Sequence, residues 1–166
     1  MINNHELLNQ ISIVEYSPNN PSIEQFETML KSWIPKDFVI DFYGQKISNH
    51  PNQERMKVIV VLYKECIIGG GIIAEGLSLN DFKDKKKLAL INGYMKDDYY
   101  NLSYFYIDSN YRSKGIGSLF LSEVNKFYQN VWLATQDKLL PFYQKNGYEI
   151  VVRRLEDEKS SLLKYK

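Results

Sequence analysis

Two glycines and two cations stand together in Arg112-Ser-Lys-Gly-Ile-Gly117, where an apolar strand pattern gives way to an apolar helical pattern. The N-terminus of a helix carries unpaired N–H groups and a partial positive charge. Glycines before it let the backbone close around an anion, and the side chains of Arg112 and Lys114 add positive charge. The spacing predicts a phosphate-binding loop. The structural alternative is an ordinary strand-to-helix turn with its cations in solvent.

Two familiar phosphate-binding motifs do not fit this loop. A Walker A loop requires Gly-x-x-x-x-Gly-Lys-Ser/Thr, and no such string occurs in the sequence. A dinucleotide fingerprint requires a third glycine three residues after Gly117, where the sequence has Phe120. The loop therefore indicates another class of phosphate ligand.

A second segment with chemical potential is LLPFYQKNGYEI, Leu139 to Ile150. Its tyrosine, Tyr143, falls inside a predicted helix. A phenol has an ordinary pKa of about 10, so it is still a proton donor at neutral pH. The alternative is plain packing, with Phe142 and Tyr148 in the core and Tyr143 at its edge.

A strand, a helix and a second strand are expected to position both segments. Leu102–Ile107 and Val131–Thr135 are rich in β-forming residues and should be parallel, because a helix beginning near Gly117 connects them. The helix has one apolar stripe, made of Phe120, Leu121, Val124, Phe127 and Tyr128.

The other elements follow from the same patterns. We expect a strand at Ile11–Tyr16, a helix after Ser22 that carries Phe26, Met29, Leu30 and Trp33, a helix at Asp37–Lys46, a hairpin of Lys57–Tyr63 and Cys66–Ala74, a long polar segment at Leu77–Asn101, a helix at Asp137–Asn146 ended by Gly147, and a closing hairpin of Tyr148–Arg154 and Ser161–Lys166. The glycines at 69–71 indicate a bulge or room for a close approach rather than a second phosphate loop, and Cys66 is expected to be buried in its strand.

Composition bounds the remaining possibilities. With 166 residues, 44% of them hydrophobic and 25% charged, the chain is expected to form one globular domain over residues 1–166. The net charge of +1 argues against nucleic acid and anionic membranes as partners. There is no signal-peptide pattern and no apolar run of spanning length, and one cysteine with two histidines is too few for a metal cluster. We expect a cytoplasmic protein. We also expect that it binds no metal.

Taken together, the two segments resemble the GNAT superfamily of acetyl-CoA-dependent N-acetyltransferases. Its main motif is Arg/Gln-x-x-Gly-x-Gly/Ala, matched by Arg112, Gly115 and Gly117. Its second motif is a Phe/Leu-Tyr pair followed by Gly-Phe/Tyr, matched by Phe142-Tyr143 and Gly147-Tyr148. The resemblance is clearest over Leu102–Val152. It implies an α/β fold with a mixed, mostly antiparallel sheet of about six or seven strands, a parallel βαβ unit and helices on both faces.

The resemblance also implies a coenzyme site. Acetyl-CoA would be the acyl-donor cosubstrate, with its pyrophosphate on the loop and its pantetheine arm along the strand ending at Ile107. The residues implied in binding are Phe105, Tyr106, Ile107, Arg112, Ser113, Lys114, Gly115, Ile116, Gly117, Ser118, Gln136 and Tyr143. Lys83 and Lys85–Lys87 are read as a solvated loop rather than as phosphate ligands.

The implied reaction is attack of a primary amine on the thioester carbonyl, with Tyr143 as the general acid for the departing thiolate. The general base is less well defined, because the position where some relatives have a carboxylate holds Asn101. Asp97, Asp98 and Glu75 are the candidates to act through water. Tyr94, Tyr99, Tyr100, Gln136 and Asp137 are candidates for contact with the acceptor.

Two classes of function stay open at this stage. One is an enzyme acting on a small-molecule or peptide amine, in a family whose members are often homodimers. The other is a non-catalytic acyl-CoA-binding or sensor module. Tyr143 in the position of the general acid favours the enzyme. The absence of a carboxylate at position 101, which is Asn101, leaves the binding module as an alternative.

Overall fold

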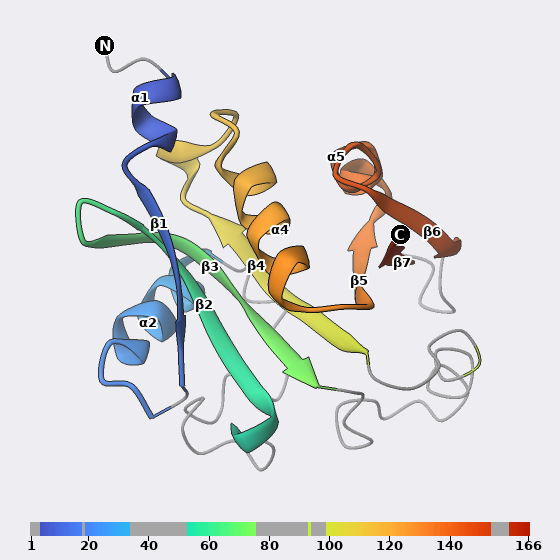
Figure 1. The fold of residues 1–166 in the computed structure, drawn as a ribbon, viewed down its shortest axis with the longest axis horizontal. Helices are drawn as coiled ribbons and strands as arrows, with labels where there is room; N and C mark the ends of the chain where they lie inside the picture. Colours follow the sequence, from blue (N-terminus) through green and yellow to red (C-terminus); the bar gives the residue numbers. More distant parts are fainter. Residues whose placement is uncertain (1–3, 18, 34–52, 76–92, 94–98, 154–159) are drawn as a thin grey trace. The chain divides into compact units, whose positions relative to one another are not determined.

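Apolar runs of five to ten residues form the strands of the protein, and two longer amphipathic segments form its main helices (Figure 1). The computed structural model describes residues 4–17, 19–33, 53–75, 93, 99–153 and 160–166. The elements in chain order are α1 (Asn4–Leu8), β1 (Ile11–Tyr16), α2 (Ile23–Trp33), the 3-10 turn η4 (Gln53–Arg55), β2 (Met56–Tyr63), β3 (Cys66–Glu75), β4 (Tyr100–Ile107), η5 (Ser109–Tyr111), α4 (Ile116–Phe127), β5 (Val131–Gln136), η6 (Asp137–Leu139), α5 (Leu140–Lys145), β6 (Tyr148–Val152) and β7 (Ser160–Tyr165).

The strands form one mixed sheet of seven strands in the order β1-β2-β3-β4-β5-β7-β6. β4 and β5 are parallel, with Tyr100 opposite Val131 and Asn101 opposite Trp132. The pairs β1–β2, β5–β7 and β6–β7 are antiparallel. This confirms the predicted fold class and the parallel βαβ unit. The predicted helix at Asp37–Lys46 and most of the segment Leu77–Asn101 lie outside the described residues.

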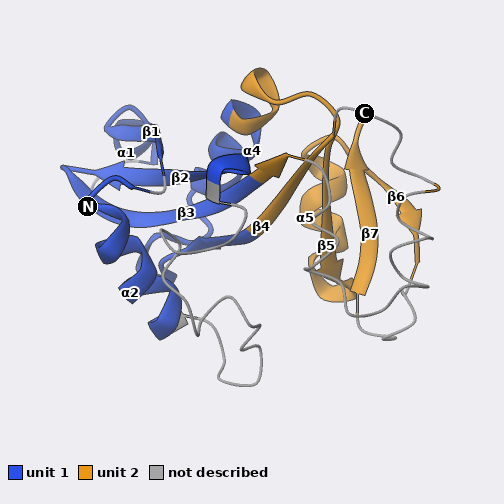
Figure 2. Ribbon diagram, turned by 90° about the horizontal axis from the view of Figure 1, so that it is seen from below, with its two compact units in different colours: residues 1–73, 104–123 blue, residues 74–103, 124–166 orange. Residues whose placement is uncertain are grey.

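The chain divides into two compact units (Figure 2). Unit 1 contains residues 1–73 and 104–123, and unit 2 contains residues 74–103 and 124–166. The division falls inside β3, β4 and α4, so each of these three elements contributes residues to both units.

Unit 1 packs helices on both faces of its strands. Gly69 and Gly70 are consecutive in β3, so side chains built on them would point to opposite faces. A Cβ on Gly70 would lie 2.7 Å from the Phe26 ring of α2, whereas one on Gly69 would lie 2.7 Å from the Ile107 side chain. Phe105, on the same face of β4 as Ile107, stacks on Phe120 of α4 with the ring centroids 4.5 Å apart. α2 and α4 therefore cover opposite faces.

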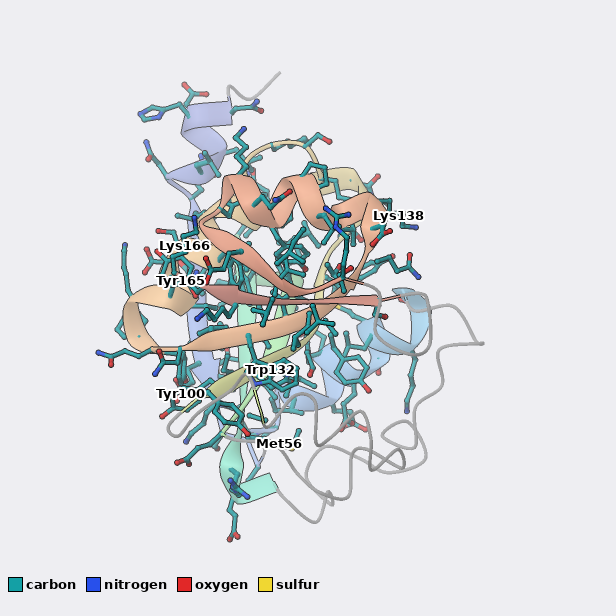
Figure 3. The ribbon with its side chains drawn as sticks, turned by 90° about the vertical axis from the view of Figure 1, so that its right-hand side faces the viewer. Met56, Tyr100, Trp132, Lys138, Tyr165 and Lys166 are labelled. Atoms are coloured by element: carbon teal, nitrogen blue, oxygen red, sulfur yellow. The ribbon has the colours of Figure 1, made fainter. Side chains whose placement is uncertain are left out.

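Unit 2 is built on β5, whose two faces have different partners. Trp132 packs on one face with Leu162, and Tyr99, Val151 and Val152 surround them. Figure 3 labels Trp132 and also Tyr100 of β4. Tyr100 precedes Asn101, the residue of β4 that is opposite Trp132 in the sheet. The other face carries Leu133 and Thr135, two residues apart and both buried.

One predicted core residue of α4 is wrong. Phe120, Leu121 and Val124 are almost fully buried, as the apolar stripe predicted, but Phe127 is 77% exposed. Phe127 is the last residue of the helix, and the stripe passes instead to Tyr128, whose ring makes an edge contact with Tyr100 at 5.0 Å. An apolar stripe identifies a helix face but does not show how far the covering elements extend along it.

The glycines of β3 give a test of this packing. A Cβ on Gly70 would lie 2.4 Å from the carbonyl oxygen of Ile59, a backbone atom with little freedom to move. We expect Gly70→Ala to lower the free energy of unfolding by about 1–3 kcal/mol through overpacking. Urea denaturation measures the difference.

Gly93→Ala is the matched control, because a Cβ on Gly93 would meet no atom of the described residues within 4 Å. Both changes add the same methyl group and restrict the unfolded chain alike. Equal stability of the two variants would contradict the close packing of β3 against β2.

Candidate functional site

The loop between β4 and α4 has an ordered start. The backbone N–H of Asp108 donates to the carbonyl oxygen of Ile68 in β3 at 2.8 Å, which ties the loop to the neighbouring strand. The Asp108 carboxylate accepts from the backbone N–H of Asn110 at 2.8 Å and caps the turn η5. The Tyr111 N–H returns to the Asp108 carbonyl at 2.9 Å. The residues that follow are therefore presented from a fixed turn.

Two left-handed residues shape the part of the loop next to α4. Ser113 has φ +60° and Gly115 has φ +86°, on either side of Lys114. Only glycine adopts this region without strain, which explains Gly115. A lack of space does not explain it, since among the described residues a Cβ there would meet only the Leu8 side chain, at 3.5 Å. The Gly115 carbonyl accepts from the Leu119 N–H at 3.0 Å, so α4 starts immediately after it and its first N–H groups face the loop.

The two cations of the loop bond to its own carbonyl groups. Arg112 Nε donates to the Ile107 carbonyl at 2.8 Å, and its guanidinium lies 4.6 Å from the centroid of the Tyr106 ring. Lys114 Nζ donates to the Asn110 carbonyl at 2.7 Å and lies 5.4 Å from the Tyr111 ring. Sequence reasoning had assigned both side chains only to added charge. Their positive charge remains at the loop, and they also hold its shape.

The strand before the loop contains a backbone feature that the sequence did not reveal. Tyr104, in the middle of β4, has φ +53°. Left-handed residues within strands occur at β-bulges, which bend the strand and re-aim its groups, and they are common next to functional sites. No residue-type signal was available, because tyrosine has no preference for this conformation. After Tyr104, Phe105 and Tyr106 are half-buried and Ile107 is buried.

Tyr143 lies in α5 of unit 2 and is only 7% exposed. Burial raises the pKa of its phenol to about 12, and a hydrogen bond with the Thr135 side chain acts in the opposite direction. Its ring makes edge contacts with Phe142 at 5.1 Å and Tyr148 at 5.7 Å. The phenol is therefore held by packing on its ring and one hydroxyl partner, and it is protonated at neutral pH.

The predicted acids and acceptor residues are spread over several segments. Glu75 is exposed at the end of β3, while Asp97, Asp98 and Tyr94 lie outside the described residues, as do Lys83 and Lys85–Lys87. Asn101 accepts a hydrogen bond from the Ser103 hydroxyl. Gln136 ends β5 half-buried, and Asp137 accepts from Ser161 Oγ at 3.1 Å.

The aromatic residues proposed for the acceptor pack within unit 2. The Tyr99 ring lies 6.4 Å from Trp132, and the Tyr100 ring meets Tyr128. Within the part of the chain that is described, the indole N–H of buried Trp132 has no hydrogen-bond partner. Nothing in the sequence distinguishes Trp132 from an ordinary core residue, since a tryptophan in a strand usually signals packing.

Cys66 was predicted to be buried but is exposed, because it is the first residue of β3 and precedes the buried run that starts at Ile67. No cluster of three potential metal-ligating side chains occurs among the described residues. None of the helices in the described ranges is long and apolar enough to cross a membrane.

Comparison with solved structures shows the same fold in several acyltransferases. Arabidopsis thaliana NAA60 in complex with acetyl-CoA has a TM-score of 0.63 at 15% identity, with 93% of this chain and 99% of that chain covered. Arabidopsis thaliana Naa50 with the bisubstrate analogue CoA-Ac-MVNAL has a TM-score of 0.60 at 15% identity, covering 95% and 99%. BjaI, a CoA-dependent acyl-homoserine lactone synthase, has a TM-score of 0.68 at 12% identity, covering 94% and 84%.

Sequence comparison identifies the family. No curated protein sequence matches the chain. The family model for the acetyltransferase (GNAT) domain matches residues 57–150. This range includes β2 except its first residue, β3 to β5, the β4–α4 loop and the helix of Tyr143. The chain belongs to the GNAT acetyltransferase family.

Proposed function

We propose that this protein transfers the acetyl group of acetyl-CoA to a primary amine. The observation that carries the proposal is the β4–α4 loop, where left-handed Ser113 and Gly115 lead into the N-terminus of α4. Backbone N–H groups from Lys114 to Ser118 would bind the pyrophosphate of the coenzyme, with Ile116 and Gly117 in the first turn of the helix. The strand residues Phe105–Ile107 would receive the pantetheine arm through backbone hydrogen bonds.

Tyr143 is the residue we assign as general acid. The amine attacks the thioester carbonyl, the C–S bond breaks, and the phenol gives its proton to the thiolate sulfur. This role comes from the family motif, and the protonated phenol in α5 is consistent with it. Glu75 and Asp98 are the candidate bases that would take the proton of the ammonium through water, and Gln136 is assigned to the coenzyme site.

The acceptor is proposed to be a small molecule or a peptide. Naa50 binds a bisubstrate analogue with a peptide portion, while BjaI is a CoA-dependent synthase of a small lactone. A screen with a short peptide carrying a free α-amine, spermidine and an aminoglycoside would separate these classes. A non-catalytic acyl-CoA-binding module is the alternative, and it would bind the coenzyme without turnover of any amine.

The first test is calorimetric titration with acetyl-CoA. We expect binding in the micromolar range, and loss of at least tenfold in affinity in Gly117→Val, because a branched side chain in the first turn of α4 would occupy the space of the phosphates. Ser122→Val, an exposed position later in the same helix, is the matched control. No binding of acetyl-CoA or a longer acyl-CoA by the folded protein would contradict the proposal.

A second test separates the shape of the loop from its charge. Arg112→Lys keeps the positive charge but loses the planar guanidinium that bonds Ile107 and covers Tyr106. We expect the dissociation constant for acetyl-CoA to rise about three- to tenfold, the effect of one hydrogen bond. Unchanged affinity in Arg112→Lys would show that charge alone is needed at this position.

The third test removes the proposed acid. Tyr143→Phe should lower kcat about 100-fold, within the usual contribution of general acid catalysis, and leave the KM for acetyl-CoA within about twofold. Steady-state kinetics with the accepted amine provide the measurement. Tyr165→Phe, another ring of the same unit, is the control. Equal rates for wild type and Tyr143→Phe would remove Tyr143 from the mechanism.

A further inference from the structure

Thr135 is a buried polar residue in a strand that otherwise buries apolar side chains. It is 7% exposed, and its side chain is hydrogen-bonded to the phenol of Tyr143, which is equally buried. A buried hydroxyl is stabilised only if it is paired, and valine would fill nearly the same volume without this requirement. The presence of threonine rather than valine at position 135, with its hydroxyl paired to that of Tyr143, therefore needs an explanation.

The register of the neighbouring strand shows what lies beside this pair. Thr135 is directly opposite Ser161 of β7, so both side chains point to the same face of the sheet. Ser161 is fully buried, and its hydroxyl donates to the Asp137 carboxylate at 3.1 Å. Because a carboxylate only accepts hydrogen bonds, the hydroxyl hydrogen of Ser161 is directed to Asp137 and away from Thr135. Ser161 therefore does not donate to Thr135. The hydrogen bond with Thr135 lowers the pKa of the Tyr143 phenol, which is the effect of a donor to the phenolic oxygen, so Thr135 is taken as the donor of this bond.

We propose that Thr135 is a positioning residue for Tyr143, which rests on the proposed role of Tyr143 as general acid. With Thr135 donating to the phenolic oxygen, the single proton of that oxygen is free to point at the sulfur of the coenzyme. When the O–H bond of Tyr143 breaks and the S–H bond forms, the phenolate oxygen keeps a hydrogen bond from Thr135. The phenol recovers its proton from water after free coenzyme A leaves.

The hydrogen bond from Thr135 offsets an energetic cost that burial imposes on the Tyr143 phenolate. An apolar environment disfavours the phenolate that a general acid becomes, and so weakens the acid. One hydroxyl donor to the oxygen favours the charged form and lowers this cost. Hydrogen bonds to charged groups are stronger than neutral ones, so the benefit should be larger in the transition state than in the ground state.

The experiment compares variants of the full chain in steady-state turnover of acetyl-CoA with the amine that gives the highest rate in the screen above. Thr135→Val should lower kcat about tenfold or more, with the KM for acetyl-CoA within about twofold. Thr135→Ser should keep kcat within about threefold, because it restores the hydroxyl. Adding Thr135→Val to Tyr143→Phe should change kcat less than twofold. Leu133→Val, which shortens a buried apolar side chain on the same face of β5, is the control for packing.

The outcomes separate this proposal from the function it rests on. If Tyr143→Phe is slow but Thr135→Val is as fast as wild type, the positioning role is wrong and the general acid stands. If Thr135→Val slows the enzyme equally with and without the Tyr143 hydroxyl, its role is only structural and the proposal is wrong. If Tyr143→Phe retains the full rate, both assignments fail together. Thr135→Ala replaces Thr135→Val if the valine variant does not fold by circular dichroism.

Discussion

The hydrogen bond from Arg112 Nε to the Ile107 carbonyl links the last residue of β4 to the loop that leads into α4. The bond closes the segment from Asp108 to Arg112. Within this segment, Asp108 is hydrogen-bonded both to β3 and to the turn η5. The direction in which the first N–H groups of α4 point depends on this closure. A flexible connection would present the same atoms in many directions, and each bound phosphate would then have to order the loop at an entropic cost.

Two glycines near this loop are required for different reasons. Gly115 is required by its backbone conformation, whereas Gly69 is required by space, since a Cβ there would lie 2.6 Å from the Tyr106 carbonyl. The glycine of β3 lets two strands approach, and Ile107 lies in that contact. The strand end that carries the loop is thus fixed by packing from one side and by Arg112 from the other.

Sequence reasoning predicted most of the strands and helices, because long apolar patterns record which face of an element is buried. β1 begins and ends where alternation predicted, and the two motif segments fall on a loop and a helix as expected. Failures occurred where burial depends on distant parts of the chain. The end of α4 exposes Phe127, and the first residue of β3 exposes Cys66. The left-handed Tyr104 and the Thr135–Tyr143 pair are tertiary features that carry no local signal.

Cys66 is the only cysteine of the chain, and its thiol is exposed at the start of β3. Two residues later, Ile68 accepts the hydrogen bond that anchors Asp108. A thiol-reactive fluorophore would therefore attach at one defined position, without any prior mutagenesis, on the strand that holds the β4–α4 loop. The native sequence already supplies a labelling site from which the environment of that strand can be followed optically.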